Sequence, residues 1–293
     1  MPASLDHCSG HLDTTFVALG FGKVAMLGVV QGISELLPIS STAHMRAIPA
    51  LLGWPDPGSA FSAAMQLAAL GAVLAYFWGD LRALAAGSLN AVAKGRWKDR
   101  ELRLAAAIAL ATIPIGIAGL LLSKILNQCA SPLRAPMVVG LACFGMALLM
   151  GLAELLARHK RTAEQLTLWD ALIIGVAQVG ALVPGFSRSG STFTGALALG
   201  FKREEAARVS FLLGIPAIAL AGTRELLLLH HAGLPAEGWR ILAIGLAVSS
   251  VSAYAAVWGL MRFLQRFSTW PLIVYRAVFG LVLVAGAAMH WIS

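Results

Sequence analysis

The sequence predicts an all-α polytopic membrane protein with six transmembrane helices and two re-entrant helical hairpins in an inverted-topology repeat. Three observations predict this fold class. The chain of 293 residues is 58% hydrophobic and 12% charged, whereas soluble domains carry about 25% charged residues. Six apolar runs are long enough to cross a bilayer as helices. Two further apolar runs are interrupted by Pro, Ser, Thr and Gly. We therefore expect a single integral membrane domain over residues 1–293.

The N-terminal segment, residues 1–20, contains no lysine or arginine. It therefore lacks the basic region that begins a secretory signal peptide. We expect a short arm that is retained on the protein.

The six uninterrupted runs each approach the ~20 apolar residues that span a bilayer. They are residues 60–79, 104–122, 136–157, 207–229, 239–262 and 270–292. The interrupted runs, residues 21–52 and 168–201, are too long for one helix and short for two full crossings. A re-entrant hairpin of two half-helices fits them better than a double crossing, which remains the alternative.

Lysine and arginine are unevenly distributed over the connections between these runs. Of the 22 basic residues, 14 lie in connections that this arrangement puts on one side of the membrane. Those connections are residues 80–103, 158–164, 202–208 and 262–266. The opposite connections hold only Lys124 and Arg134. The positive-inside rule assigns the basic face to the cytoplasm and both termini to the outside. The net charge of +8 thus reflects topology, and we do not expect a nucleic-acid partner.

The two interrupted segments resemble each other. The first reads GVVQGISELLPISST from Gly28, and the second reads GVAQVGALVPGFSRS from Gly175. By the topology above, one hairpin enters from outside and the other from inside. The two halves, approximately residues 21–122 and 168–262, would then form an inverted repeat with its site where the broken helices meet. The alternative is a chance match in a sequence rich in Gly, Val and Ala.

The first interruption gathers groups that could do chemistry. Glu35 lies between apolar residues, where a carboxylate is unfavourable unless it is paired, solvated or bound to a metal. Gln31 lies four residues earlier, on the same helical face, and Pro38 ends the helix. Hydroxyl, imidazole and guanidinium groups follow: Ser40, Ser41, Thr42, His44 and Arg46. The alternative is a protonated Glu35 inside the bundle, with the hydroxyls bonded to their own helix.

The second interruption has the composition of an anion-binding turn. It reads PGFSRSGST over residues 184–192, and Arg188 is the only charged residue between Asp170 and Lys202. Glycine lets backbone amides approach a ligand, hydroxyls at a helix start suit a phosphate, and a guanidinium adds bidentate recognition. The candidate phosphate-binding residues beside Arg188 are Gly185, Ser187, Ser189 and Thr192. A glycine-rich packing kink is the alternative, but it leaves Arg188 unexplained. A carboxylate with hydroxyls facing an anion clamp is what phosphoryl transfer needs.

These motifs resemble those of the undecaprenyl-diphosphate phosphatase family, also called the bacitracin-resistance protein family. The family's first motif, E/Q-x-x-x-E followed by P-x-S-S-T-x-H, corresponds to Gln31 through His44. Its second motif, P-G-x-S-R-S-x-x-T, corresponds to residues 184–192. Length and apolar pattern also fit, so the resemblance covers essentially the whole chain. One departure is the neutral amide of Gln31 at the first acidic position, which weakens any two-carboxylate metal site.

The resemblance implies an enzyme of the bacterial inner membrane, with its site open to the periplasmic side. Such an enzyme hydrolyses the C55 lipid undecaprenyl diphosphate to undecaprenyl phosphate and inorganic phosphate. It thereby recycles the carrier lipid for cell-wall synthesis and confers bacitracin resistance. Membrane lipid and the polyprenyl diphosphate are the implied partners, and a homodimer is an assembly that the sequence leaves open.

The resemblance also implies residue roles and a divalent cation, Mg²⁺ or Ca²⁺. By motif position, Ser41 is the nucleophile, Glu35 binds the cation or acts as acid and base, His44 assists proton transfer, and Arg188 clamps the diphosphate. Attack by a water beside Glu35 and His44 is the alternative to a covalent step. The substrate-binding set is Gln31, Ser40, Thr42, Gly185, Ser187, Ser189 and Thr192.

A transporter or flippase of a lipid phosphate or small anion is the competing interpretation. Inverted repeats with broken helices are typical of transporters, and Glu35 with Arg188 could serve proton-coupled movement. The combination of hydroxyl, imidazole and carboxylate favours the enzyme, since transport needs only binding groups. The two activities can coexist in one protein. A structural scaffold would leave both intramembrane charges without a purpose.

Overall fold

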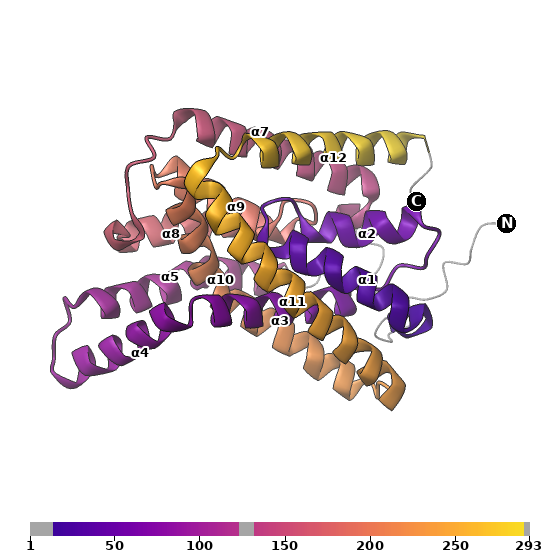
Figure 1. The fold of residues 1–293 in the computed structure, drawn as a ribbon, viewed down its shortest axis with the longest axis horizontal. Helices are drawn as coiled ribbons and strands as arrows, with labels where there is room; N and C mark the ends of the chain where they lie inside the picture. The colour runs from indigo at the N-terminus through magenta and orange to yellow at the C-terminus, as the bar shows by residue number, and fades with distance from the viewer. Residues whose placement is uncertain (1–13, 123–131, 290–293) are drawn as a thin grey trace.

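The computed structural model describes residues 14–122 and 132–289, and its assigned elements are all helices (Figure 1). Most of the arm expected at residues 1–20 lies outside the described residues. The α-helices are α1 Phe16–Leu36, α2 Ser41–Leu51, α3 Ser59–Tyr76, α4 Trp78–Ala93, α5 Arg100–Leu121, α7 Pro136–Leu156, α8 Leu168–Val179, α9 Arg188–Ala198, α10 Arg203–His231, α11 Ala236–Arg266 and α12 Trp270–Ala288. Three short 3₁₀ helices are η1 Pro132–Arg134, η2 Ala163–Gln165 and η3 Gly180–Leu182.

Six of the described helices are long and apolar enough to cross a membrane: α1, α5, α7, α10, α11 and α12. The last five coincide with predicted runs. The run predicted at residues 60–79 is α3, which ends at Tyr76, and the chain then bends by 77° into α4. The basic connection predicted at residues 80–103 therefore contains a helix, because its alanine- and leucine-rich sequence favours one.

Helix α1 begins earlier than the interrupted run predicted from residue 21. Gly20 has a φ of 72° and bends α1 near its start, so the regular part of the helix begins where the run was expected. Large apolar side chains remain exposed on α5, α7 and α12, among them Leu120, Leu155 and Val278. An apolar exterior on span-length helices is the pattern of a multi-pass membrane protein.

Each interrupted run consists of a helix, a break and a second helix of 11 residues. We call residues 37–40, between α1 and α2, the first break, and residues 183–187, before α9, the second break. Each break ends in a serine with positive φ, 75° at Ser40 and 69° at Ser187. Non-glycine residues rarely adopt this conformation, and such backbone strain concentrates at functional sites.

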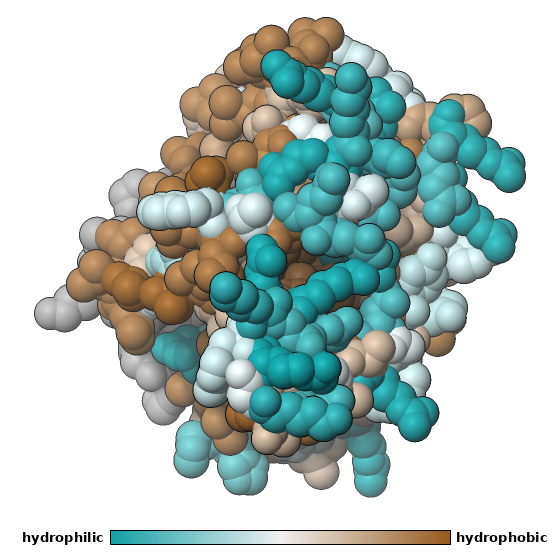
Figure 2. Space-filling view, turned by 90° about the vertical axis from the view of Figure 1, so that its left-hand side faces the viewer, coloured by the Kyte–Doolittle hydropathy of each residue, from teal (hydrophilic) through white to brown (hydrophobic). Residues whose placement is uncertain are grey.

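Three of the four basic connections meet at one end of the molecule, as the charge distribution predicted. Arg100 pairs with Glu164 at 2.8 Å and Arg208 pairs with Asp80 at 2.8 Å. These contacts join the segments around α4–α5, η2 and α10. Figure 2, which views the side of the α4–α5 connection, shows hydrophilic side chains gathered across this end between hydrophobic flanks.

Close helix packing positions the two breaks in the interior. Helix α1 lies against α11 through Gly28 and Gly32, where a Cβ would meet the backbone of α11; such small-residue contacts are typical of membrane helices. Helices α7 and α12 lie side by side (Figure 1). Helix α2 packs beneath them through a small cluster that includes Ala43, Val139 and Leu283. Residues of α12 therefore lie within reach of both breaks.

Candidate active site

Glu35 is the centre of the candidate site. It lies on the last turn of α1 and is only 4% exposed. Its Oε2 accepts hydrogen bonds from Gln31 Nε2 at 3.0 Å and from Ser41 Oγ at 2.5 Å. Its Oε1 accepts one from Arg188 Nη2 at 3.1 Å. A single carboxylate thus joins an amide, a hydroxyl and a guanidinium that the sequence predicted as site residues.

Two helix N-termini converge on this carboxylate. Ser41 is the first residue of α2, and Arg188 is the first residue of α9. The first turn of a helix presents unpaired amides and a positive dipole end, which together favour anions. The arrangement therefore combines a hydroxyl, a cation and two electropositive helix starts around one point.

One donor of Arg188 has no partner among the described residues. Its side chain is 11% exposed, and no polar group of the described residues pairs with its buried Nε. A buried donor without an acceptor is unfavourable, and a phosphate oxygen would satisfy it. On its other side the guanidinium packs against α10 at Gly214, where a Cβ would overlap Nη1.

Hydrogen bonds hold the two interrupted runs together. Ser189 Oγ donates to the carbonyls of Glu35 and Leu37, at 3.0 Å and 3.2 Å. The Gly185 amide donates to Thr42 Oγ1 at 3.2 Å. Gly185 has a φ of 95°, and a Cβ there would overlap the backbone at Val139, so only glycine fits. Three predicted binding residues therefore connect the breaks to each other.

His44 makes its hydrogen bonds to groups other than Glu35. Its Nδ1 is 2.7 Å from the Ser40 carbonyl and its Nε2 is 2.7 Å from the hydroxyl of Tyr275. Its ring stacks on Phe279 at 4.1 Å. Because a carbonyl can only accept, Nδ1 carries a proton, and in the neutral ring Nε2 accepts from the tyrosine hydroxyl. The His44 ring thus faces α12, one turn of α2 after Ser41.

The remaining predicted residues support the helix starts. Ser187 Oγ accepts from the Gly190 amide at 3.1 Å and so caps α9. Thr192 Oγ1 lies 2.5 Å from Ser210 Oγ of α10, and Ser40 Oγ lies 3.3 Å from Thr42 Oγ1. Ser187 and Thr192 lie near Arg188 because all three belong to the start of α9. Their hydrogen bonds in the described structure do not involve the Glu35 carboxylate.

The sequence interpretation missed two residues of α12. Arg276 is fully buried and donates to carbonyls of both breaks, and Tyr275 binds His44. A signal was available for the first, because an arginine within an apolar span marks a functional site by default. No sequence signal indicated the second.

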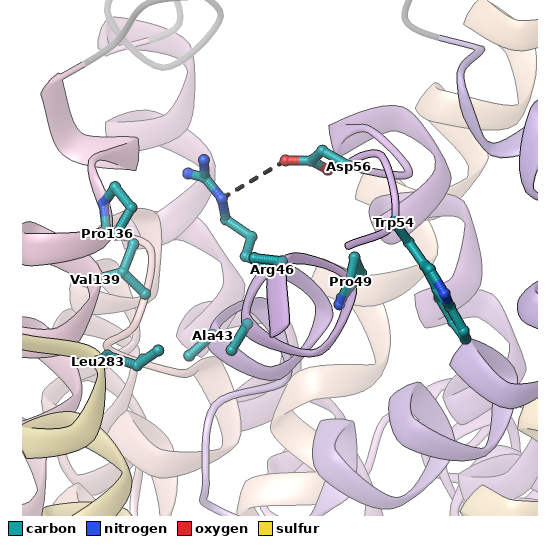
Figure 3. A pocket seen from close by; sticks show the side chains of 10 residues that line it. Ala43, Arg46, Pro49, Trp54, Asp56, Pro136, Val139 and Leu283 are labelled. Atoms are coloured by element: carbon teal, nitrogen blue, oxygen red, sulfur yellow. Dashed lines mark ion pairs between the residues drawn. The ribbon is translucent and has the colours of Figure 1, made fainter. Parts of the chain in front are cut away.

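A cavity of about 260 Å³ lies beside α2, on the side that faces α7 and α12. Figure 3 shows Arg46 extended over it, with Pro136 and Val139 on one wall and Trp54 and Asp56 on the other. Arg46 pairs with Asp56 at 3.7 Å and donates to the Arg134 carbonyl. Helix α7 runs from this cavity to the basic end, where Glu154 pairs with Arg203 at 2.7 Å. The cavity therefore lies at the end of the molecule opposite the basic connections.

The side-chain oxygens at Glu35 could hold a divalent cation only if a bound substrate supplied further oxygen ligands. No group of three or more His, Cys, Asp or Glu side chains within residues 14–122 and 132–289 could hold a metal ion. Mg²⁺, however, is commonly bound by one or two carboxylates with substrate phosphates completing its shell. Glu35 provides one such carboxylate, and Gln31, whose Nε2 donates to Glu35 Oε2, provides a neighbouring amide.

Known proteins similar to this chain were identified over nearly its whole length. The family described as "Bacitracin resistance protein BacA" matches residues 24–282. A protein of Mesorhizobium japonicum named "Undecaprenyl-diphosphatase 2" is 64% identical over 264 residues, covering 90% of this chain and 100% of the relative.

Two proteins named "Undecaprenyl-diphosphatase" are also similar. That of Gloeobacter violaceus is 48% identical over 91% of both chains. That of Trichormus variabilis is 46% identical, over 89% of this chain and 82% of its own. With both motifs meeting at one buried carboxylate and the family matched from residue 24 to residue 282, the chain belongs to the bacitracin resistance protein BacA family.

Proposed function

We propose that this protein hydrolyses undecaprenyl diphosphate to undecaprenyl phosphate and inorganic phosphate, and so confers resistance to bacitracin. One observation carries the proposal: Ser41, Glu35 and Arg188 form a continuous hydrogen-bonded set between the two breaks. This set joins a nucleophile, a proton acceptor and a phosphate-binding cation. The similar proteins named undecaprenyl-diphosphatase support the same substrate.

Substrate binding would separate the two parts of the lipid. The prenyl chain lies among the apolar helix faces, while the diphosphate enters between the breaks. The free Nε of Arg188 and the first amides of α2 and α9 then bind phosphate oxygens. These donors are already positioned, so little reorganisation accompanies the reaction.

The hydrogen bond from Ser41 to Glu35, at 2.5 Å, supports a covalent route. The hydroxyl proton passes to Glu35 while Oγ attacks the terminal phosphorus in line. The bond from that phosphorus to the bridging oxygen breaks, and undecaprenyl phosphate leaves with the proton that Glu35 returns to this oxygen. Glu35, ionised again, then deprotonates a water that attacks the phosphoserine. The bond from phosphorus to Ser41 Oγ breaks, Oγ takes the proton back from Glu35, and inorganic phosphate is released. Direct attack by water is the alternative route.

A divalent cation, Mg²⁺ or Ca²⁺, belongs to this proposal. Glu35 and the amide oxygen of Gln31 would hold it together with phosphate oxygens of the substrate. When bound, it would neutralise negative charge on the transferring phosphoryl group. Since Glu35 is paired with Arg188, cation and substrate are expected to bind together.

The proposed membrane arrangement is that of an inner-membrane protein with its site open to the periplasm, where the diphosphate is recycled for cell-wall synthesis. The cavity beside α2 lies at the end of the molecule with few lysine and arginine residues, which supports this side. The helix–break–helix structure of both interrupted runs and the equivalent positions of Ser40 and Ser187 support two re-entrant hairpins in an inverted repeat.

Phosphate release from undecaprenyl diphosphate tests the proposal. The purified protein in mild detergent is assayed with Mg²⁺, Ca²⁺ or EDTA, beside Glu35→Ala and Arg188→Ala. Arg224→Ala is the matched control, because Arg224 is exposed and pairs only locally with Glu225. Cation-dependent release that is lost in the two site variants and kept in the control supports the proposal. No release by folded protein under any condition contradicts it and directs the next assay to lipid-phosphate transport in liposomes.

A further inference from the structure

Arg276 of α12 is a buried arginine whose described partners are all main-chain carbonyls. Its side chain is 0% exposed. Its Nε donates to the Cys143 carbonyl at 3.1 Å and its Nη1 to the Pro38 carbonyl at 2.7 Å. Its Nη2 donates to the carbonyls of Gly185 and Phe186, at 2.8 Å and 2.7 Å. One guanidinium thus contacts both breaks and α7.

No carboxylate among the described residues compensates this charge. None of the ion pairs found within the described residues includes Arg276. A buried charge without a counter-ion is unfavourable, more so inside an apolar bundle. An apolar residue would fill the same volume more favourably if packing were the only requirement. The position therefore calls for a reason other than packing.

Three of the four carbonyls that it binds belong to the breaks, the segments that lead into the reactive residues. Pro38 lies in the first break, shortly before Ser41, and Phe186 lies in the second break, shortly before Arg188. Backbone carbonyls at a helix end or in a break have no helical partner. A single planar guanidinium can bind several of them at fixed angles. The geometry of both breaks is thereby fixed to one rigid group.

Gly190 in the first turn of α9 accommodates the guanidinium. A Cβ at this position would lie 2.6 Å from Arg276 Nη1, which is too close without a shift. Alanine at position 190 would therefore displace the Arg276 side chain without removing any of its donors.

We infer that Arg276 is a positioning residue: it holds the two breaks in register so that Ser41, Glu35 and Arg188 converge. Arg276 acts through the backbone and not through contact with the substrate. A test by phosphate release rests on the proposed function, whereas a test by hydrogen exchange does not.

Steady-state phosphate release by Arg276→Met and Arg276→Lys tests the inference, with Arg262→Met as the matched control. Arg262 stacks on Trp258, away from both breaks. Since a displacement of 1 Å in a site can reduce a rate by about 100-fold, we expect kcat of Arg276→Met to fall by about that factor. The KM for the lipid diphosphate should change little, because Arg188 remains. Lysine should restore part of kcat, since one ammonium can bind only some of the carbonyls.

A double-mutant cycle with Gly190→Ala separates positioning from general destabilisation. The single variant Gly190→Ala is expected to lower kcat about tenfold. The same substitution in the Arg276→Met background should have little further effect, because the guanidinium that it displaces is gone. Independent, multiplicative losses would overturn the inference, as would full activity in Gly190→Ala. If Arg276→Met does not fold, the activity of Gly190→Ala alone still tests the inference.

Hydrogen exchange provides the readout that is independent of activity. Amides of residues 39–41 and 187–189 should exchange faster in Arg276→Met or Arg276→Lys than in the wild type, while Arg262→Met leaves them unchanged. Unchanged exchange in the breaks contradicts the positioning role even if activity falls. If the Arg276 variants show faster exchange in the breaks but the wild-type protein releases no phosphate, the positioning role is supported and the phosphatase proposal is rejected.

Discussion

Glu35 and Arg188 form a buried ion pair at 3.1 Å across a sequence separation of 153 residues. Each residue comes from a different interrupted run, so the pair exists only when both breaks meet. The side chains are 4% and 11% exposed, which leaves little solvent to screen them. A phosphate that binds Arg188 must therefore share the guanidinium with Glu35, which links substrate binding to the proton acceptor.

The ion pair predicts different outcomes for stability and for activity. Glu35→Gln or Arg188→Met alone leaves one buried charge unpaired, which destabilises by about 3–5 kcal/mol. The double variant leaves no unpaired charge and should recover most of the loss in thermal unfolding midpoint, measured in detergent. Phosphate release should remain absent in all three proteins.

The control for this prediction is an exposed ion pair. Arg100 and Glu164 are 61% and 64% exposed, so Arg100→Ala should change stability by less than about 1 kcal/mol. A double variant as unstable as the sum of the single variants would show that the two charges do not interact in the folded protein.

The local features of this protein could be predicted from its sequence. Apolar runs predicted five of the span-length helices, because lipid requires about 20 apolar residues for each crossing. Pro38 and Pro184 with their neighbouring serines indicated both breaks. The charge of Glu35 and that of Arg188 indicated the site, since an intramembrane charge needs a partner.

The features that could not be predicted depend on contacts between distant segments. The bend of 77° between α3 and α4 has no proline or other strong sequence signal. His44 and Tyr275 are 231 residues apart, and nothing in either segment specifies that they pair. Arg276 binds carbonyls, which every residue carries, so its partners have no sequence signature.

Ser41→Ala distinguishes the covalent route from direct attack by water. If Ser41 is the nucleophile, the variant should lose phosphate release by at least about 10³-fold, since a nucleophile acting with its base is not replaced. The wild-type protein, quenched in acid during turnover with labelled terminal phosphate, should carry the label on Ser41. Ser34→Ala is the control, because the Ser34 hydroxyl bonds only to the Val30 carbonyl of its own helix. Substantial hydrolysis by Ser41→Ala would reject the covalent route.

Tyr275→Phe tests whether the contact with His44 matters for turnover. The substitution removes the hydroxyl that lies 2.7 Å from Nε2 but keeps the ring that stacks near it. We expect kcat to fall about three- to tenfold, which is less than the ~10²–10⁴-fold attributed to a full acid–base group. In a His44→Ala background the same substitution should have no effect. Equal losses in both backgrounds would mean that the tyrosine acts independently of His44.

Gly214→Ala tests the position of the Arg188 guanidinium without changing a polar group. A Cβ on Gly214 of α10 would overlap Arg188 Nη1, so the guanidinium must shift from its present position. Because binding and the transition state both need this cation, kcat/KM should fall at least about tenfold. Gly71→Ala of α3 is the control, since no atom lies within 4 Å of its added Cβ. That control should raise helix stability by up to about 1 kcal/mol and leave phosphate release unchanged. Full activity in Gly214→Ala would show that the Arg188 position is adaptable and that its contact with Glu35 does not limit turnover.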